Sequence, residues 1–294
     1  MRKRAVIIQA LRCFFIDRGY LEVDTPIRLP ALAPEAHIEP EPAGDWFLQT
    51  SPELCMKRLL AAGNPKLFQI CKCFRKGERG RTHLGEFTML EWYRADSDYH
   101  DLMADCEQLF QFIGERLGHG NMLEYKGCRI ALPPPWQCLA VSDAFDSYAP
   151  LSVEEAIARD LFDEMLVTHI EPQLGRNQPV FLCDYPAVMA SLSAISKNNP
   201  RVAERFELYV NGLELANGFT ELIDPEEQRC RFEQERRIIE GMGRLPGPMP
   251  EPFLGALADM PPAAGIALGV DRLAMVFTDA ARIDEVIPFR PEEL

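Results

Sequence analysis

Residues 74–94, FRKGERGRTHLGEFTMLEWYR, constrain the fold more than any other stretch of the chain. They follow an apolar segment (67–70) and contain a short, charged turn broken by glycine. On the return segment, every second residue is apolar, aromatic or acidic: Phe87, Met89, Glu91 and Tyr93. Because alternate residues of a strand lie on one face, the pattern predicts a strand–turn–strand hairpin with these side chains on the same side.

The residue types of this hairpin suit a nucleotide. Arg75 carries forked donors that can clamp a phosphate, and the Phe87 ring can stack on a base. Glu91 places an acid where an ammonium group of a substrate could lie. Taken alone, Arg75 with Glu78 is more often a surface ion pair, and Phe87 is more often a core residue. The functional interpretation therefore needs other motifs.

Composition narrows the class of protein. The 294 residues are 47% apolar, enough for a sizeable core in one large domain or two small ones. A net charge of −14 argues against a broad nucleic-acid-binding surface, which needs clustered Lys and Arg. No apolar run is long enough to span a membrane. The nine cysteines are spread along the chain without metal-ligand spacing, which predicts reduced thiols in a cytoplasmic protein.

The remaining patterns predict an α+β domain. We expect helices at 6–15 and 102–117, and a further helix that opens at 51–53 with Ser51 as N-cap. We expect strands at 20–23, 46–49, 180–182, 206–210 and 264–268. Asn211-Gly212 is a two-residue hairpin turn, and Asp224 caps a helix that continues to about Met242. Strands joined by hairpins and irregular connections favour a mostly antiparallel sheet. Residues 121–176 are expected to form an inserted, partly helical segment of the single domain 1–294.

Three segments occur in an informative order: residues 19–26 (GYLEVDTP), 74–91, and 265–273 (GIALGVDRL). They resemble motifs 1, 2 and 3 of the class II aminoacyl-tRNA synthetases. Residues 50–59 and 212–222 (GLELANGFTEL) are similar to the lysine branch of that family. The resemblance covers nearly the whole chain outside the middle segment. It implies the family's catalytic core, a mostly antiparallel sheet flanked by helices.

Motif 1 begins within twenty residues of the start, leaving no anticodon-binding domain before it. In this the chain resembles the stand-alone relatives that lysylate elongation factor P. The resemblance implies an ATP-dependent, Mg²⁺-using ligase that activates a lysine, with (R)-β-lysine favoured, as an adenylate and transfers it to a lysine side chain of elongation factor P. It also implies a cytoplasmic homodimer formed through residues 19–26. Two alternatives stay open: a minimal lysyl-tRNA synthetase, which the acidic charge disfavours, and a silent regulatory paralogue that binds lysine or ATP.

The resemblance also implies residue roles for the nucleotide. Arg75 would hold the α-phosphate and the substrate carboxylate together, and Arg272 would hold the γ-phosphate or cover the adenine; both are catalytic candidates. Further ATP-binding candidates are Lys76, Gly77, Glu78, His83, Leu84, Phe87, Glu207, Leu208 and Gly269. Glu207 and Glu214 are expected on facing strands of the 211–212 hairpin, where they could share Mg²⁺. Leu84-Gly85 and Lys76-Gly77 replace the family's usual Asn-Pro and Asn-Glu.

For the lysine, the resemblance implies a pocket rich in acids. Its candidate residues are Ser51, Pro52, Glu53, Glu91, Tyr93, Glu214, Asn217, Phe219, Glu221 and Ala267. Ser51 with Glu53 would meet the amino group nearest the carboxylate, and Glu91 with Glu221 would meet the distal one. Lysyl-tRNA synthetases typically have Gly at the position of Ala267. The Ala267 methyl would crowd an α-amino group while tolerating one on the β-carbon.

Overall fold

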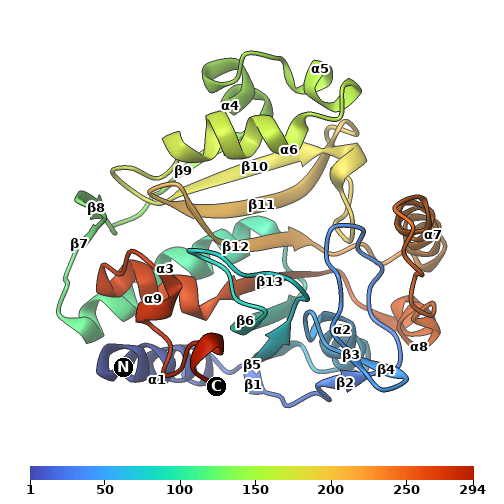
Figure 1. Cartoon of the computed structure of the whole chain (residues 1–294), viewed down its shortest axis with the longest axis horizontal. Helices are drawn as coiled ribbons and strands as arrows, with labels where there is room; N and C mark the ends of the chain where they lie inside the picture. Colours follow the sequence, from blue (N-terminus) through green and yellow to red (C-terminus); the bar gives the residue numbers. More distant parts are fainter.

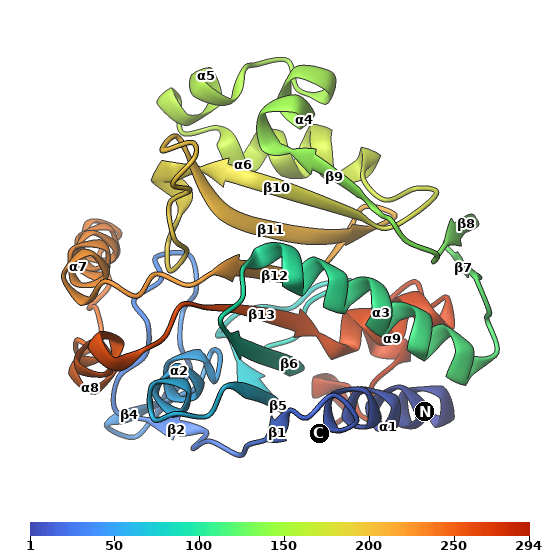
Figure 2. The ribbon, with the colours of Figure 1, turned by 180° about the vertical axis from the view of Figure 1, so that it is seen from behind.

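An eight-stranded sheet organises the computed structural model, which describes residues 1–294 (Figures 1 and 2). In spatial order its strands are β1 (Leu21–Glu22), β5 (Lys66–Phe74), β6 (Glu86–Ala95), β13 (Ala263–Gly269), β12 (Leu213–Thr220), β11 (Val202–Val210), β10 (Val180–Pro186) and β9 (Gln137–Ala140). The two edge pairs, β1–β5 and β9–β10, are parallel, and every pair between them is antiparallel. The predicted mostly antiparallel sheet is therefore confirmed.

Helices cover one face of this sheet. They are α1 (Arg2–Ile16), α3 (Tyr99–Leu117) and α9 (Val270–Thr278), and Figure 2 shows α3 lying across the strands. Their apolar sides and the inward residues of the strands form the largest core cluster. Phe15 of α1, for example, stacks on Phe68 with ring centroids 5.1 Å apart. Because strand residues alternate, Leu90 and Trp92 enter this core while Glu91 and Tyr93 point to the opposite face.

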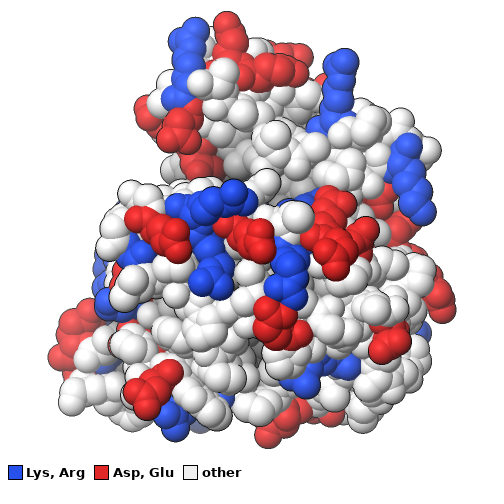
Figure 3. Space-filling view, turned by 90° about the vertical axis from the view of Figure 1, so that its right-hand side faces the viewer, with Lys and Arg blue, Asp and Glu red and all other residues white.

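Smaller elements border the opposite face at one end, on the right of Figure 1. They are α2 (Glu53–Ala61), α7 (Pro225–Gly241), α8 (Glu251–Ala256) and a small sheet of β2 (Arg28–Leu29), β4 (Trp46–Leu48) and β3 (Pro42–Ala43). Asp224 caps α7 as predicted, accepting from the backbone N–H groups of Glu226 and Glu227. On the face seen in Figure 3, acidic and basic side chains are interspersed.

The middle segment has its own small core. It contains the hairpin β7 (Met122–Tyr125) and β8 (Cys128–Ala131), then β9, followed by α4 (Val141–Tyr148), α5 (Val153–Ala158) and α6 (Phe162–Met165). Phe145 stacks on Phe162 with ring centroids 5.0 Å apart, in a cluster that also includes Tyr185 of β10. Since β9 pairs with β10, this segment also supplies an edge strand of the main sheet.

Short helical turns connect the larger elements: Leu166–Ile170, Glu171–Gln173, Ala187–Met189, Leu257–Asp259, Ile283–Glu285 and Pro291–Glu293. No helix combines the length and the apolar character that crossing a membrane requires. Helix α2 begins at Glu53 with Pro52 as N-cap, one residue later than expected, although the Ser51 Oγ still accepts from the Glu53 N–H at 3.0 Å.

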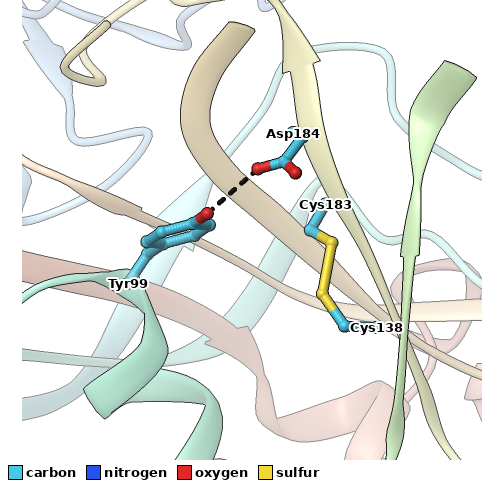
Figure 4. Close-up of a disulfide and its surroundings, with 4 residues drawn as sticks. All are labelled: Tyr99, Cys138, Cys183 and Asp184. Atoms are coloured by element: carbon cyan, nitrogen blue, oxygen red, sulfur yellow. Dashed lines mark hydrogen bonds between the residues drawn. A yellow bond between two sulfur atoms is a disulfide. The ribbon is translucent and has the colours of Figure 1, made fainter. Parts of the chain in front are cut away.

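A disulfide between Cys138 and Cys183 corrects the expectation that all cysteines are reduced (Figure 4). The two residues lie on neighbouring strands, β9 and β10, with Cα atoms 6.4 Å apart. Nothing local in the sequence indicates this pairing, because 45 residues separate the two cysteines. The other seven cysteines are free. Beside the bond, the Tyr99 hydroxyl donates to Asp184 at 3.0 Å and ties α3 to β10.

A buried ion pair joins α1, β6 and α9. Arg4 Nη1 lies 2.6 Å from Asp271 Oδ1, and Arg4 Nη2 donates to the Thr88 hydroxyl at 3.0 Å. The second Asp271 oxygen accepts from the Thr88 N–H at 2.6 Å. This contact fixes the start of α9, where Arg272 follows directly.

Replacing Arg4 with Met should lower the free energy of unfolding by about 3–5 kcal/mol, because Asp271 would be left charged and unpaired in the core. Urea denaturation of the purified variant measures this. Arg2→Met, which changes an exposed residue of the same helix, is the control and should shift stability by less than about 0.5 kcal/mol. Equal losses in the two variants would contradict the interpretation.

Candidate active site

Cross-strand rows build the open face of the sheet. One row crosses β6, β13, β12 and β11 and contains Glu91, Ala267, Asn217 and Glu207. The next row contains Tyr93, Gly265, Phe219 and Arg205. The central strand β13 contributes only small residues to this face: Gly265, Ala267 and Gly269. The result is a hollow floored by β13 and walled by larger polar side chains from the strands on either side.

Gly265 is required by close packing. A Cβ at this position would lie 2.2 Å from the Tyr93 ring and 2.4 Å from the Glu221 carboxylate. Neither group can retreat easily, because both are buried. The glycine therefore lets Tyr93 lie flat over β13 and form part of the pocket.

A β-bulge decides where Glu214 points. The turn at Asn211-Gly212 has positive φ at both residues, +46° and +74°, as a two-residue hairpin requires. The register then shifts, so that Tyr209 pairs with Glu214 while Leu208 pairs with Ala216. Leu215 is the extra residue. In a regular strand of this sequence, Glu214 and Asn217 are three residues apart and would face opposite sides of the sheet; the bulge places them on the same side.

The hairpin brings Glu207 and Glu214 to facing strands, as expected, and both line the same side of the sheet. The register places Asn217 directly opposite Glu207. Leu208 is completely buried on the core side, so its side chain cannot contact a nucleotide in the hollow.

Two connected cavities occupy the hollow. We call the first, of about 360 Å³, the arginine cavity; it is lined by Arg75, Glu78, His83, Leu84, Phe87, Glu207, Glu214, Gly269 and Arg272, among others. The second, of about 470 Å³, is the acidic cavity; it is lined by Ser51, Glu53, Glu91, Tyr93, Asn217, Phe219 and Ala267, among others. Most candidates from the sequence are therefore brought together.

Some candidates fall outside these cavities. Pro52 is the buried N-cap of α2, and Gly77 forms the positive-φ position of the turn, φ +76°. Lys76 pairs with Glu39 at 2.5 Å and lines a third cavity instead. Glu214 lines the arginine cavity only, so its expected contact with the lysine is not supported by its position.

The arginines of the arginine cavity contact neighbouring side chains of the protein. The Arg75 guanidinium lies over the Phe87 ring, 5.1 Å from its centroid, and 3.8 Å from Glu78. Arg272 contacts the Glu214 carboxylate at 3.1 Å and the His83 ring nitrogen at 2.5 Å. Partial burial and the charge of Arg272 lower the pKa of His83, which favours a neutral ring that accepts from Arg272.

Arg205 is a site residue that sequence reasoning missed. It lines both cavities and donates to Glu207 at 2.6 Å and to the Asn217 side-chain oxygen at 3.0 Å. The Tyr209 hydroxyl donates to the other Glu207 oxygen at 2.7 Å. Burial nevertheless raises the pKa of Glu207. The alternation of Arg205, Glu207 and Tyr209 on one strand was the available signal.

Glu91 lies at the centre of the acidic cavity. It accepts from the Ser51 hydroxyl at 2.5 Å and from the Tyr93 hydroxyl at 2.9 Å. Burial, helped by the negative charge of Glu53, raises the pKa of Glu91 to about 8. A cation bound beside Glu91 would oppose both effects and favour the ionised form. The cavity is thus suited to a positively charged guest.

Lys57 is the second missed residue. Its fully buried ammonium lies 2.5 Å from Glu53 and 2.5 Å from Glu221. Although burial opposes it, the charges of Glu221 and Glu53 raise the pKa of Lys57. Glu221 lines neither cavity and its carboxylate pairs with Lys57, so its position does not support the expected contact with a distal amino group. The i,i+4 spacing of Glu53 and Lys57 on α2 was the only local signal.

Comparison with known proteins identifies a family that this chain matches. A family model described as tRNA synthetases class II (D, K and N) matches residues 1–293. A protein of Pectobacterium atrosepticum named elongation factor P–(R)-beta-lysine ligase is 42% identical, covering 99% of this chain and 94% of the relative. Proteins with the same name from Sodalis glossinidius, 42% identical over 99% and 94%, and Vibrio vulnificus, 40% identical over 98% and 94%, are also similar.

Replacing Lys57 with Met should lower the free energy of unfolding by about 3–5 kcal/mol near pH 8, because Glu221 loses its buried partner. Burial raises the pKa of Glu221 to about 8 even with Lys57 present, and without the opposing charge of Lys57 it would rise further. Stability should therefore recover as pH falls and the carboxyl takes up a proton. Urea denaturation at pH 8 and pH 5.5 measures both effects. Arg58→Met, an exposed neighbour on α2, is the control and should show neither.

Proposed function

This chain belongs to the class II tRNA synthetases, and we propose that it activates a lysine with ATP and transfers it to a lysine side chain of elongation factor P. The observation that carries the proposal is the junction of an arginine-lined cavity with an acid-lined one, with Arg75 in both. The relatives covering nearly the full length of this chain carry the corresponding name.

The first step joins two anions. An oxygen of the lysine carboxylate attacks the α-phosphorus of ATP, the bond to the bridging oxygen breaks, and pyrophosphate leaves. Arg75 would neutralise the carboxylate and the α-phosphate together, while Arg272 would hold the outer phosphates. No covalent bond to the protein is needed, so positioning and charge neutralisation lower the barrier. Phe87 lines the same cavity and would provide an aromatic surface for the adenine.

Mg²⁺ fits the arginine cavity as a partner of the phosphates. Glu207 and Glu214 both line it, and one or two carboxylates with substrate phosphates are the usual way proteins bind this ion. No group of three or more acidic, His or Cys side chains could hold a metal without the nucleotide. Glu207 and Glu214 would hold the ion, which would offset the negative charge of the phosphates, while Arg205 and Arg272 keep the two carboxylates in place.

The acidic cavity would select the lysine. Glu53 and Glu91 face it, and Ser51 and Tyr93 fix the Glu91 carboxylate. A shorter or neutral amino acid would leave a buried acid without a partner, which costs binding energy. Lys57 pairs with both Glu221 and Glu53, so Glu91, which makes no ion pair within the protein, is the cavity acid most open to a substrate ammonium group.

Location and assembly follow from the same proposal. Ile16, Leu21 and Ile27 are 55%, 53% and 43% exposed around the segment expected to form a homodimer, which a partner copy would cover. Seven free cysteines suit a reducing cytoplasm, although a disulfide such as Cys138–Cys183 is uncommon there. On α7 and α8, Arg229 pairs with Glu251 and Arg231 with Glu227, which disfavours tRNA on that face.

Arg75→Ala should reduce lysine-dependent ATP–pyrophosphate exchange by at least about a hundredfold, because the shared clamp on both anions is lost. The measurement is exchange of labelled pyrophosphate into ATP. Arg81→Ala, an exposed arginine of the same loop, is the control and should retain full exchange. Full exchange in Arg75→Ala would refute the assignment.

Ala267→Gly should raise the use of α-lysine relative to (R)-β-lysine by about tenfold or more, the effect expected for one methyl group in a pocket. Ala267 lies between Glu91 and Asn217 on the pocket floor, so its removal opens space beside an α-amino group. The ratio of kcat/KM for adenylate formation with the two isomers measures this. An unchanged ratio would mean that Ala267 does not determine which lysine isomer the enzyme prefers.

Elongation factor P and tRNA are distinguished as acceptors by one incubation. Labelled lysine and ATP are supplied with the enzyme and either the factor or tRNA, and the labelled product is separated by size and by nuclease treatment. We expect nuclease-resistant label on the factor. Label on the RNA would instead favour a minimal synthetase, and no adenylate with either isomer would favour a silent paralogue.

A further inference from the structure

The two cavities of the active site meet at a small set of residues. Those that line both are Glu35, Ile38, Arg75, Met89, Arg205, Asn217 and Ala267. Under the proposed function, the adenylate would place its acyl carbon and its phosphate on either side of this junction. Glu35 is the one acid among the shared residues. Each of the other acids that line these cavities lines only one of the two.

Glu35 is held at the junction by its backbone rather than by its side chain. It belongs to the loop between β2 and β3, whose Ala36 N–H donates to Glu235 of α7 at 2.8 Å. Arg244 donates to the Ala36 carbonyl, and the Lys76 N–H donates to the Glu39 carbonyl at 2.8 Å. The Glu35 carboxylate itself makes no hydrogen bond or ion pair within the protein. It is therefore positioned, yet free to accept from a bound molecule.

A third cavity reaches Glu35 from another side. It has a volume of about 320 Å³, lies between residues 32–42 and 244–248, and shares Glu35 and Ile38 with both other cavities. Pro34, Phe47, Leu245 and Pro246 give it apolar walls. Such walls suit the four-carbon stem of a lysine side chain, whose ammonium would then arrive at Glu35. ATP and the activated lysine would leave this route open.

We propose that Glu35 is the catalytic base of the transfer step, a role that rests on the proposed function. The Glu35 carboxylate takes a proton from the acceptor lysine's ammonium. The freed amine attacks the acyl carbon of the adenylate, a C–N bond forms, and the acyl C–O bond breaks. AMP leaves with that electron pair, and the nitrogen loses its second proton to solvent as the amide forms.

The surroundings of Glu35 suit a base working near neutral pH. Burial raises the pKa of Glu35 to about 7. Arg75 on the motif 2 hairpin and Arg205 on β11 oppose this rise, whereas Glu53 on α2 and Glu235 on α7 add to it. A base is most effective when its pKa is close to the working pH, because it is then both ionised and basic enough.

Glu35→Gln separates the two steps. Lysine-dependent pyrophosphate exchange should stay within about twofold of wild type, whereas single-turnover transfer from preformed adenylate to elongation factor P should fall by about 10²–10⁴-fold at pH 7. Glu41→Gln is the matched control; Glu41 lies in the same loop and lines none of the three cavities. Equal urea denaturation midpoints for the variants and wild type establish that folding is intact.

The pH profile gives a second readout. Wild-type transfer should rise with pH up to about 7 and then level off as Glu35 becomes fully ionised. In Glu35→Gln the acceptor must lose its proton to solvent first, so transfer should keep rising about tenfold per pH unit toward the lysine pKa of about 10.4. Glu35→Asp should restore the plateau at a reduced rate, because a carboxylate is present but shorter.

Three results would overturn the inference or its premise. Unchanged transfer and an unchanged pH profile in Glu35→Gln would mean that the adenylate phosphate or solvent takes the proton. Lost exchange with a raised KM for lysine would make Glu35 a residue that binds the first substrate. Absence of lysine-dependent exchange in the wild-type protein would instead remove the proposed function itself.

Discussion

The small side chains that β13 presents to the open face are the constraint on which the rest of the site depends. This strand presents Gly265, Ala267 and Gly269 to the open face, and its neighbours carry the large and charged side chains. A bulky residue at position 265, 267 or 269, on the open face of β13, would fill the hollow. Because the strand lies in the middle of the sheet, its backbone cannot shift to make room, and so the cavity is a property of the register rather than of a flexible loop.

Charge compensation is the second principle of the site. The chain places many acids in one hollow, and uncompensated they would repel one another and resist burial. The buried Lys57 pairs with Glu221, and the partly buried Arg205 pairs with Glu207. These cations let the remaining acids stay available without destabilising the fold. The acids therefore fall into two groups, those paired inside the protein and those left for a guest.

Sequence reasoning succeeded where structure depends on near neighbours. The alternation on β6, the Asn211-Gly212 turn and the Asp224 cap are local, and each was confirmed. The resemblance to a known family assigned Arg75 and Arg272 to one site, and both line the arginine cavity. Partners far apart in the chain were missed, such as Lys57 with Glu221 and Cys138 with Cys183. A periodic pattern says which way a side chain points, but not which side chain of another element it meets.

The bulge at Leu215 has a consequence for how this region can change over evolutionary time. Leu215 is the unpaired extra residue, so a chain that lost it could pair as a regular strand, with Glu214 still opposite Tyr209 and two residues from Asn217. Glu214 would then stay on the open face beside Arg272. Loss of the bulge is therefore a change in length that this hairpin can accept without turning Glu214 away from the site.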